Sequence, residues 1–286
     1  MPQTINTNLV SLNAQRNLST SQSSLATSMQ RLSSGLRVNS AKDDAAGLAI
    51  AERMHTQVRG MNVAMRNAND GISLAQVAEG ALGKVADIFQ RMRELAVQAA
   101  NGTNTSADRT SLNDEYLQLA REAARTLGGT QFNGQNILAT TVNSVFQVGA
   151  NTSASLDQIS VAAFDWTSVA NITTAIGSAV GTDPTTAIAG TDGSFALAAI
   201  TGIDAAISSV NSQRATFGAV QNRFDSVVAN LMVAAENQTS ARARIMDADY
   251  ATETANLSRA SILQQAGNAM VAQANQLPQQ VLALLR

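Results

Sequence analysis

Apolar residues recur every seven positions near both ends of this chain, and this spacing limits the fold more than any other feature. At the N-terminal end, three leucines stand seven apart, and two further apolar residues follow the second and third of them by four: Leu18, Leu25 and Leu32, then Met29 and Leu36. A 3–4 alternation is typical of helices that pair along an apolar seam. It predicts a helix over about residues 5–34, ended by Ser33-Ser34-Gly35.

The C-terminal end carries a matching pattern. Four apolar residues stand seven apart, namely Leu263, Met270, Leu277 and Leu284, and Val281 follows Leu277 by four. Pro278 lies inside this seam and should disturb the helix locally, because proline lacks an amide hydrogen and crowds the preceding turn. Each terminal helix can bury its stripe on the other terminal helix or on another copy of the chain.

Two long helices are predicted between the ends. A capping-box spacing at Ser40 to Asp43 starts the first, which runs to Ala100 with an apolar or small residue every three or four positions. The second spans about residues 195–240 on five residues spaced seven apart: Ile203, Val210, Phe217, Phe224 and Leu231. Each would form a rod of more than ten turns.

Shorter elements complete the expected fold. A capping box at Thr105 to Asp108 precedes a helix that ends at Gly128-Gly129. Residues 145–148 and 159–161 read as a β-hairpin, and residues 165–194, which show no period, read as a connector or small cap. The sequence therefore predicts a mainly α fold: a long antiparallel helical bundle with terminal coiled-coil helices and one small β-hairpin region.

Composition argues against most chemical functions. The net charge is −2 and only 14% of residues are charged, so the chain lacks the basic surface that nucleic acid needs. There is no cysteine, and the one histidine, His55, excludes multi-histidine metal sites. Asp43, Asp44, Asp247 and Asp249 lack the spacing of a calcium loop, so helix capping explains them better. We expect no enzyme activity, cofactor or metal.

The N-terminal residues and the hydropathy pattern bear on the cellular location of the chain. Residues 1–6 do not read as a signal peptide, and no uninterrupted run of about 18 apolar residues occurs. We therefore expect no membrane insertion. The same features fit either a cytoplasmic protein or export without a cleaved signal.

Several long strings closely resemble bacterial flagellin. In the N-terminal half they are residues 30–37 (QRLSSGLR), 39–47 (NSAKDDAAG), 66–73 (RNANDGIS), 93–98 (RELAVQ) and 130–134 (TQFNG). In the C-terminal half they are residues 218–225 (GAVQNRFD), 249–253 (DYATE) and 274–282 (ANQLPQQVL). The resemblance covers about residues 4–164 and 195–286.

The resemblance implies a structural subunit that self-assembles into the flagellar filament for swimming motility. By analogy with the family, residues 1–44 with 245–286 would form the inner tube, and residues 45–164 with 195–244 the outer tube. Residues 165–194 are too short for the extra outer domains of larger members, which implies a thin, smooth filament. The implied route is secretion through the flagellar type III apparatus. The implied partners are other copies, an export chaperone, the filament cap and the hook–filament junction proteins.

A further implication concerns host recognition. Flagellins of this type are sensed as monomers by a Toll-like innate immune receptor through the outer-tube helices. The matching motif is residues 90–95 (QRMREL), followed by Asp114-Glu115 on the next helix. By resemblance, Arg91, Leu95 and Glu115 are the expected receptor contacts, although the same residues could serve subunit packing.

Two other readings stay open from the residues alone. A hook–filament junction protein would share the terminal heptads but form a short adaptor and no long polymer. A secreted helical translocator would also lack a signal peptide and carry coiled coils, but it would insert into membranes.

Overall fold

The computed structural model describes residues 7–177 and 187–284, with side chains described as far as residue 276. The chain divides into two compact units, and the division falls inside two long helices, between residues 57 and 58 and between residues 235 and 236. The expected inner-tube and outer-tube boundaries at 44/45 and 244/245 concern the assembled polymer and stay a prediction.

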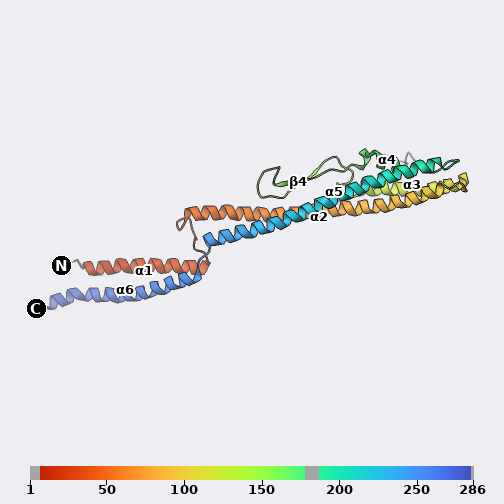
Figure 1. Cartoon of the computed structure of the whole chain (residues 1–286). Coiled ribbons are helices and arrows are strands. Elements are labelled where there is room, and N and C mark those ends of the chain that lie inside the picture. The colour runs from red at the N-terminus through yellow and green to blue at the C-terminus, as the bar shows by residue number, and fades with distance from the viewer. Residues whose placement is uncertain (1–6, 178–186, 285–286) are drawn as a thin grey trace. The chain divides into compact units, whose positions relative to one another are not determined.

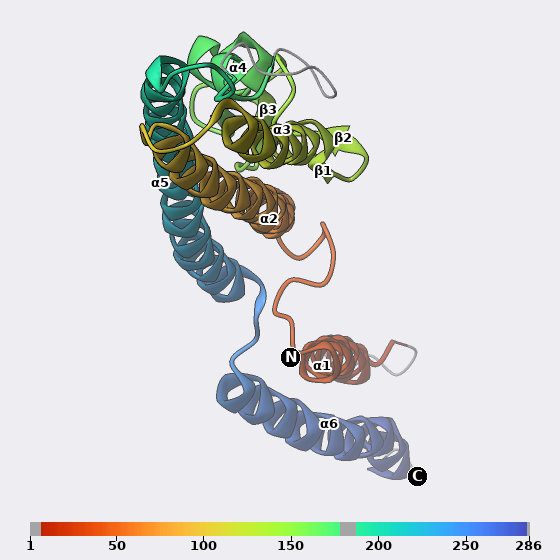
Figure 2. The same cartoon turned by 90° about the vertical axis from the view of Figure 1, so that its right-hand side faces the viewer.

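The first unit contains the two terminal helices, α1 (Leu9–Ser34) and α6 (Tyr250–Leu284), side by side (Figures 1 and 2). The start of α1 lies beside the far part of α6, because the Asn8 amide donates to the Ala274 carbonyl at 2.7 Å. Gly35 ends α1 in a left-handed conformation, φ +71°, as the glycine predicted. The α6 backbone stays helical across Pro278 as far as Leu284, so the proline does not end the helix.

The second unit is built on α2 (Ala45–Ala99), α3 (Ser106–Gly129) and α5 (Ser194–Met246), whose buried side chains form one core. The capping box before α3 is confirmed, since the Thr105 hydroxyl and the Asp108 carboxylate bond each other's backbone amides. The first long helix begins slightly later than expected. Its cap is Asp44, whose carboxylate accepts from the Gly47 amide at 2.8 Å, while Asp43 closes the preceding turn.

The predicted stripes of the long helices form the core. On α2 the residues from Ala64 onward at the predicted spacing are buried, including Leu82, Phe89 and Met92. On α5, four of the five heptad residues are buried and Leu231 is half-buried. At Gly71 the two helices approach closely, because a Cβ there would lie 2.6 Å from the Phe224 ring. Phe146 holds that ring in an edge contact, with centroids 5.5 Å apart.

Two hairpins lie between α3 and α5 in the sequence. The expected one is β3 (Ser144–Gln147) paired antiparallel with β4 (Gln158–Val161). A second, unexpected pair joins β1 (Gln131–Phe132) to β2 (Gln135–Asn136) across Asn133-Gly134. Both turn residues have positive φ, +49° and +76°, which is the geometry that Asn-Gly favours in a two-residue hairpin turn. The dipeptide could have predicted this turn.

The stretch expected to be a connector contributes to the core. It holds a 3₁₀ turn, η1 (Trp166–Ser168), and a short helix, α4 (Ala170–Ile176). Trp166, Ile172 and Ile176 are buried at 1% exposure or less. The sequence did not reveal α4 because seven residues are too few for a helical period.

A buried arginine, which the sequence analysis missed, joins three segments of the second unit. Arg109 on α3 is 3% exposed, and its guanidinium donates to the carbonyls of Ala99, Asn101 and Thr191 at 2.9–3.1 Å. Arg109 thereby caps the C-terminal end of α2, where carbonyl oxygens have no hydrogen-bond partner within the helix.

We predict that Gly71→Ala destabilises the second unit. The added methyl meets the Phe224 ring, which Phe146 restrains, so the expected loss is about 1–3 kcal/mol in the free energy of unfolding. Gly80→Ala on the same helix is the control, because a Cβ at Gly80 meets nothing within 4 Å and should stabilise by about 0.5–1 kcal/mol. Denaturant unfolding of both variants measures the difference, and equal effects would contradict the packing argument.

Candidate functional site

The contact between α1 and α6 is shallow and largely polar. Among the side chains that the structure describes, the buried ones are Ser11 and Ser28 on α1 and Glu253, Ala260 and Ala274 on α6. Three of the five are polar, and the other two are alanines. Apolar burial stabilises in proportion to area, so this pair gains little from it.

Polar contacts tie the two helices together along their length. Arg31 donates to the Glu253 carboxylate at 3.1 Å, and the Glu253 side chain is only 8% exposed. Near the other end, the Ser11 hydroxyl donates to the Asn275 side chain at 2.7 Å. A charge-assisted bond to a buried carboxylate is the strongest of these interactions. Sequence reasoning missed Glu253 because a single acid in an apolar-striped helix looks like surface charge.

The predicted seam residues divide into three groups in the single chain. Leu18, Leu25 and Leu32 are half-buried, and Leu18 lies opposite Gly267, whose added Cβ would be 3.1 Å from the leucine. Leu36 is half-buried and bridges to Asp247. The exposed members are Met29, Leu263 and Met270, at 51–59% exposure. Leu277, Val281 and Leu284 lie outside the residues whose side chains are described.

Both terminal helices therefore present apolar side chains outward. Besides the exposed seam members, Leu9, Val10 and Leu12 on α1 and Ile262 on α6 are 53–69% exposed. An apolar surface gathered on two helices of one unit is typical of a protein–protein contact. That the seam residues take part in assembly stays a prediction, since a second copy would have to cover the exposed ones.

A small cluster lies where the terminal helices meet the rest of the first unit. Val38, Ala51 and Met246 are buried together, and the amide of Arg37 donates to the Met246 carbonyl at 2.6 Å. Nearby, amide and hydroxyl donors of Ser40, joined by the Asn39 amide, lower the pKa of Asp43 from its ordinary value. Asp43 therefore stays ionised as a turn-forming acceptor and is not a free ligand.

The expected receptor contacts lie in the second unit and differ in accessibility. The guanidinium of Arg91 bonds the Glu94 carboxylate at 2.8 Å and that of Glu115 at 3.0 Å, and these bonds raise the pKa of Arg91. Both partners of the Arg91–Glu115 pair are about half exposed. Leu95, in contrast, is 1% exposed and belongs to the core. It cannot serve as the expected surface anchor in this conformation and instead supports the helix that carries Arg91.

Metal chemistry finds no support in the described part of the chain, where no three histidine or acidic side chains gather in a metal-binding group. His55 lies 3.9 Å from the Glu52 carboxylate and is partly exposed. This geometry is that of a surface pair.

Within the described part of the chain, one helix, α5, is long and apolar enough to cross a membrane by length and composition, and 28% of its most apolar 18-residue window is buried. Its fully buried heptad residues, such as Ile203 and Val210, pack in the core of the second unit. Asp204 and Arg214 on the same helix form ion pairs with Arg93 and Glu79 on α2. Core packing accounts for the heptad residues of α5, whereas Phe195, Leu197, Met232 and Val233 on the same helix are exposed. The expectation of no membrane insertion stays a prediction.

Comparison with known proteins gives a consistent result across the chain. Residues 5–143 match the family model of the bacterial flagellin N-terminal helical region, and residues 200–285 match that of the C-terminal helical region. A flagellin of Halalkalibacterium halodurans is 47% identical over 283 residues and covers 99% of both chains. The flagellar filament 33 kDa core protein of Treponema phagedenis is 42% identical over 297 residues, also covering 99% of both. A crystal structure of Bacillus cereus flagellin is 37% identical with a TM-score of 0.48, covering 58% of this chain and 88% of that one.

We predict that Glu253→Gln weakens the α1–α6 pair. The variant replaces a charge-assisted bond to Arg31 with a neutral one, and the expected loss is about 1.5–3 kcal/mol in the free energy of opening the pair. Glu122→Gln is the control, because its ion pair with Arg125 lies within one helix with both side chains exposed and is worth about 0–0.5 kcal/mol. Amide hydrogen exchange along α1 and α6 measures the opening. Equal protection in the two variants would contradict a central role for Glu253.

Proposed function

The chain belongs to the bacterial flagellin family, so it is a structural subunit of the flagellar filament and not an enzyme. From this we propose that its terminal helix pair drives assembly. The observation that carries the proposal is the outward apolar surface of α1 and α6, including Met29, Leu263 and Met270. Each terminal helix buries little of this surface within its own chain. Contacts between copies that repeat without closing produce a helical polymer.

We also propose secretion through the flagellar type III apparatus, with the chain exported unfolded. The absence of cysteine supports this, because no disulfide would have to be reduced before export. The shallow α1–α6 contact supports it as well, since a pair with few buried apolar residues opens at low cost. An export chaperone would cover the exposed apolar residues of the terminal helices before assembly. The filament cap and the hook–filament junction proteins would meet the same surface at the two ends of the filament.

Recognition of the monomer by a Toll-like innate immune receptor is the second part of the proposal. Arg91 and Glu115 support it, because they lie on neighbouring helices, are half exposed, and combine a forked donor with an acid. Leu95 would act indirectly, by holding α2 in place beneath Arg91.

We predict that removal of residues 263–286 abolishes assembly. Purified full-length chain, heated to monomer and cooled with filament seeds, should elongate into tubes visible by electron microscopy. The truncated chain should remain monomeric, because it loses most of the apolar surface of α6, while residues 45–240 keep a cooperative melt. Full-length chain that stays monomeric would contradict the filament proposal. Elongation that stops at short adaptors would favour a junction protein, and leakage of liposomes would favour a translocator.

A point substitution tests the same surface more finely. Met270→Gln should raise the critical concentration for elongation by about tenfold, because burying a methionine contributes on the order of 1.5 kcal/mol or more. Ser258→Gln, an exposed polar position on the same helix, is the control and should leave elongation unchanged. Light scattering during seeded growth gives both values.

We predict that Arg91→Ala lowers receptor affinity of the monomer by about tenfold, as expected for a hot-spot arginine. Arg125→Ala is the control, because Arg125 is also an exposed, ion-paired arginine of the second unit. Surface plasmon resonance on the receptor ectodomain measures both. Equal affinities would remove Arg91 from the proposed contact.

A further inference from the structure

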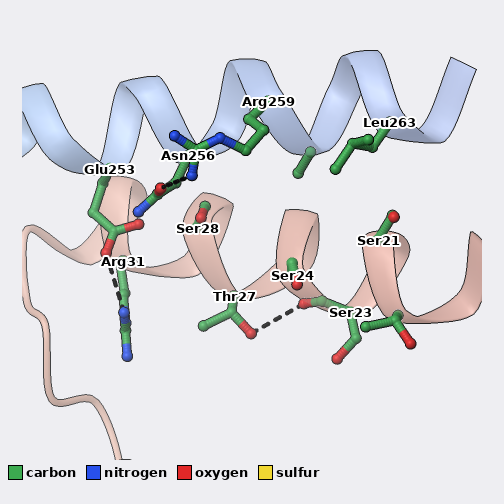
Figure 3. Close-up of a pocket in the computed structure, with 12 residues that line it drawn as sticks. Ser21, Ser23, Ser24, Thr27, Ser28, Arg31, Glu253, Asn256, Arg259 and Leu263 are labelled. Carbon is green, nitrogen blue, oxygen red and sulfur yellow. Dashed lines mark hydrogen bonds and ion pairs between the residues drawn. The ribbon is translucent and has the colours of Figure 1, made fainter. Parts of the chain in front are cut away.

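A groove of about 460 Å³ runs between α1 and α6 (Figure 3). Hydroxyl groups of α1, among them Ser24 and Ser28, line one wall, and Asn256 and Arg259 of α6 line the other. The Arg31–Glu253 ion pair closes one end, and Leu263 lies at the edge of the groove. The groove thus combines a polar interior with an exposed apolar residue.

Several donors that line this groove make no hydrogen bond among the described residues, and the Ser28 hydroxyl and the Arg31 Nε are the least exposed of them. Ser28 is 6% exposed, and among the described residues its hydroxyl has no hydrogen-bond partner, although Figure 3 shows it on the side of α1 that faces α6. The Nε of Arg31 is buried and is also without a partner in the described structure. A buried polar atom without a partner, such as the Nε of Arg31, costs about 1–3 kcal/mol, and the Ser28 hydroxyl beside it is a donor left free to bond an incoming acceptor.

The other hydrogen-bond donors of the groove differ in whether they already have an acceptor. The hydroxyls of Thr20, Ser21 and Thr27 donate to carbonyls four residues back on α1, at 3.0–3.1 Å. Arg259 makes one long contact, 3.4 Å to the Asn256 side-chain oxygen, and its side chain is exposed. The guanidinium can therefore donate further bonds into the groove. An acceptor that enters the groove therefore finds unused donors on both Ser28 and Arg259.

The charges of the terminal helices favour a neutral acceptor. Glu253 faces the same groove but is already paired with Arg31, so the choice of acceptor depends on what the terminal helices of a second copy offer. The α1 sequence contains no aspartate or glutamate, and the α6 sequence contains only Glu253. Both helices instead expose amide side chains, for example Gln22, Gln30, Gln265, Asn268 and Gln273. An amide oxygen accepts two hydrogen bonds without bringing a charge into the contact.

We propose that, in the assembled polymer, this groove receives an exposed glutamine or asparagine side chain from a terminal helix of a second copy. The inference deepens the proposed function and depends on it. Apolar contacts such as that of Leu263 tolerate sliding, because they have no direction. One matched polar group buried in such a contact specifies the register of the two helices, since every other register leaves it unpaired. The groove therefore sets how neighbouring copies align.

Matched substitutions separate this role from a structural one. Ser28→Ala should leave the monomer melt unchanged or raise it, because the hydroxyl that it removes makes no hydrogen bond within the described chain. It should nevertheless raise the critical concentration for elongation about fivefold or more, because the incoming amide loses a donor. Arg259→Gln should act in the same direction. Ser19→Ala and Arg16→Gln are the controls, since both residues are exposed on α1 outside the groove.

Crosslinking identifies the occupant, because the chain contains no cysteine to interfere. Copies with Ser24→Cys are mixed with copies that carry one cysteine at an exposed amide position, and the mixture is assembled and oxidised. A disulfide requires the two Cβ atoms to lie within about 4.5 Å. We expect one amide position to give crosslinked dimers in polymer and none in monomer.

The possible results distinguish two failures. If wild-type chain elongates while Ser28→Ala behaves like Ser19→Ala, or if no amide position crosslinks, the groove proposal is overturned and the filament proposal stands. Saturable binding of inorganic phosphate to the monomer, lost in Arg259→Gln, would also overturn it in favour of an anion site. Wild-type chain that does not elongate on seeds would overturn both proposals.

Discussion

Close approach of alanine-rich helix faces is the constraint on which the structure depends, because the chain has few large side chains with which to fill a core. The second unit meets this constraint over most of its length. Ala68 and Ala75 on α2 are fully buried, and Gly71 between them leaves room for the ring of Phe224. Most of the few aromatic residues lie in this unit, and Phe89, Tyr116 and Trp166 are among its most deeply buried side chains. This unit therefore has a complete core of its own.

The first unit does not meet the same constraint within one chain. Its helices touch through small and polar residues, one ion pair and half-buried leucines such as Leu18, while Met29 and Met270 remain exposed. Incomplete burial has two consequences with one cause. A pair with few buried apolar residues should open at low cost, which fits the proposed export, and cover by other copies would complete its packing, which fits the proposed assembly role. The groove beside Ser28 adds direction to a contact that apolar residues alone would leave free to slide.

Most of the long elements could be predicted from the sequence, because a period sustained over many turns outweighs local exceptions. The stripes of α2 and α5 and the capping box at Thr105 are confirmed. The missed features are short or depend on distant partners. Hydrophobic periodicity could not reveal α4, because this helix has only seven residues. The Asn133-Gly134 turn was overlooked although its dipeptide favours such turns. Arg109 looked like surface charge, since the three carbonyls it bonds come from segments up to 82 residues away.

The heptads at the two ends of the chain show what the sequence alone can predict and what it cannot. By itself the sequence determined that α1 and α6 are helices with an apolar stripe and that the chain resembles flagellin, because period and motif are local properties of the residues. Only the tertiary structure decided which part of each stripe is used within the chain. It placed Leu18 against Gly267, turned Met29 and Leu263 outward, and buried Ser28 and Glu253 between the helices. The reason is geometric: a heptad marks one side of a helix, but the rotation of each helix about its axis depends on which partner side chains fit closest, and small residues allow the closest approach.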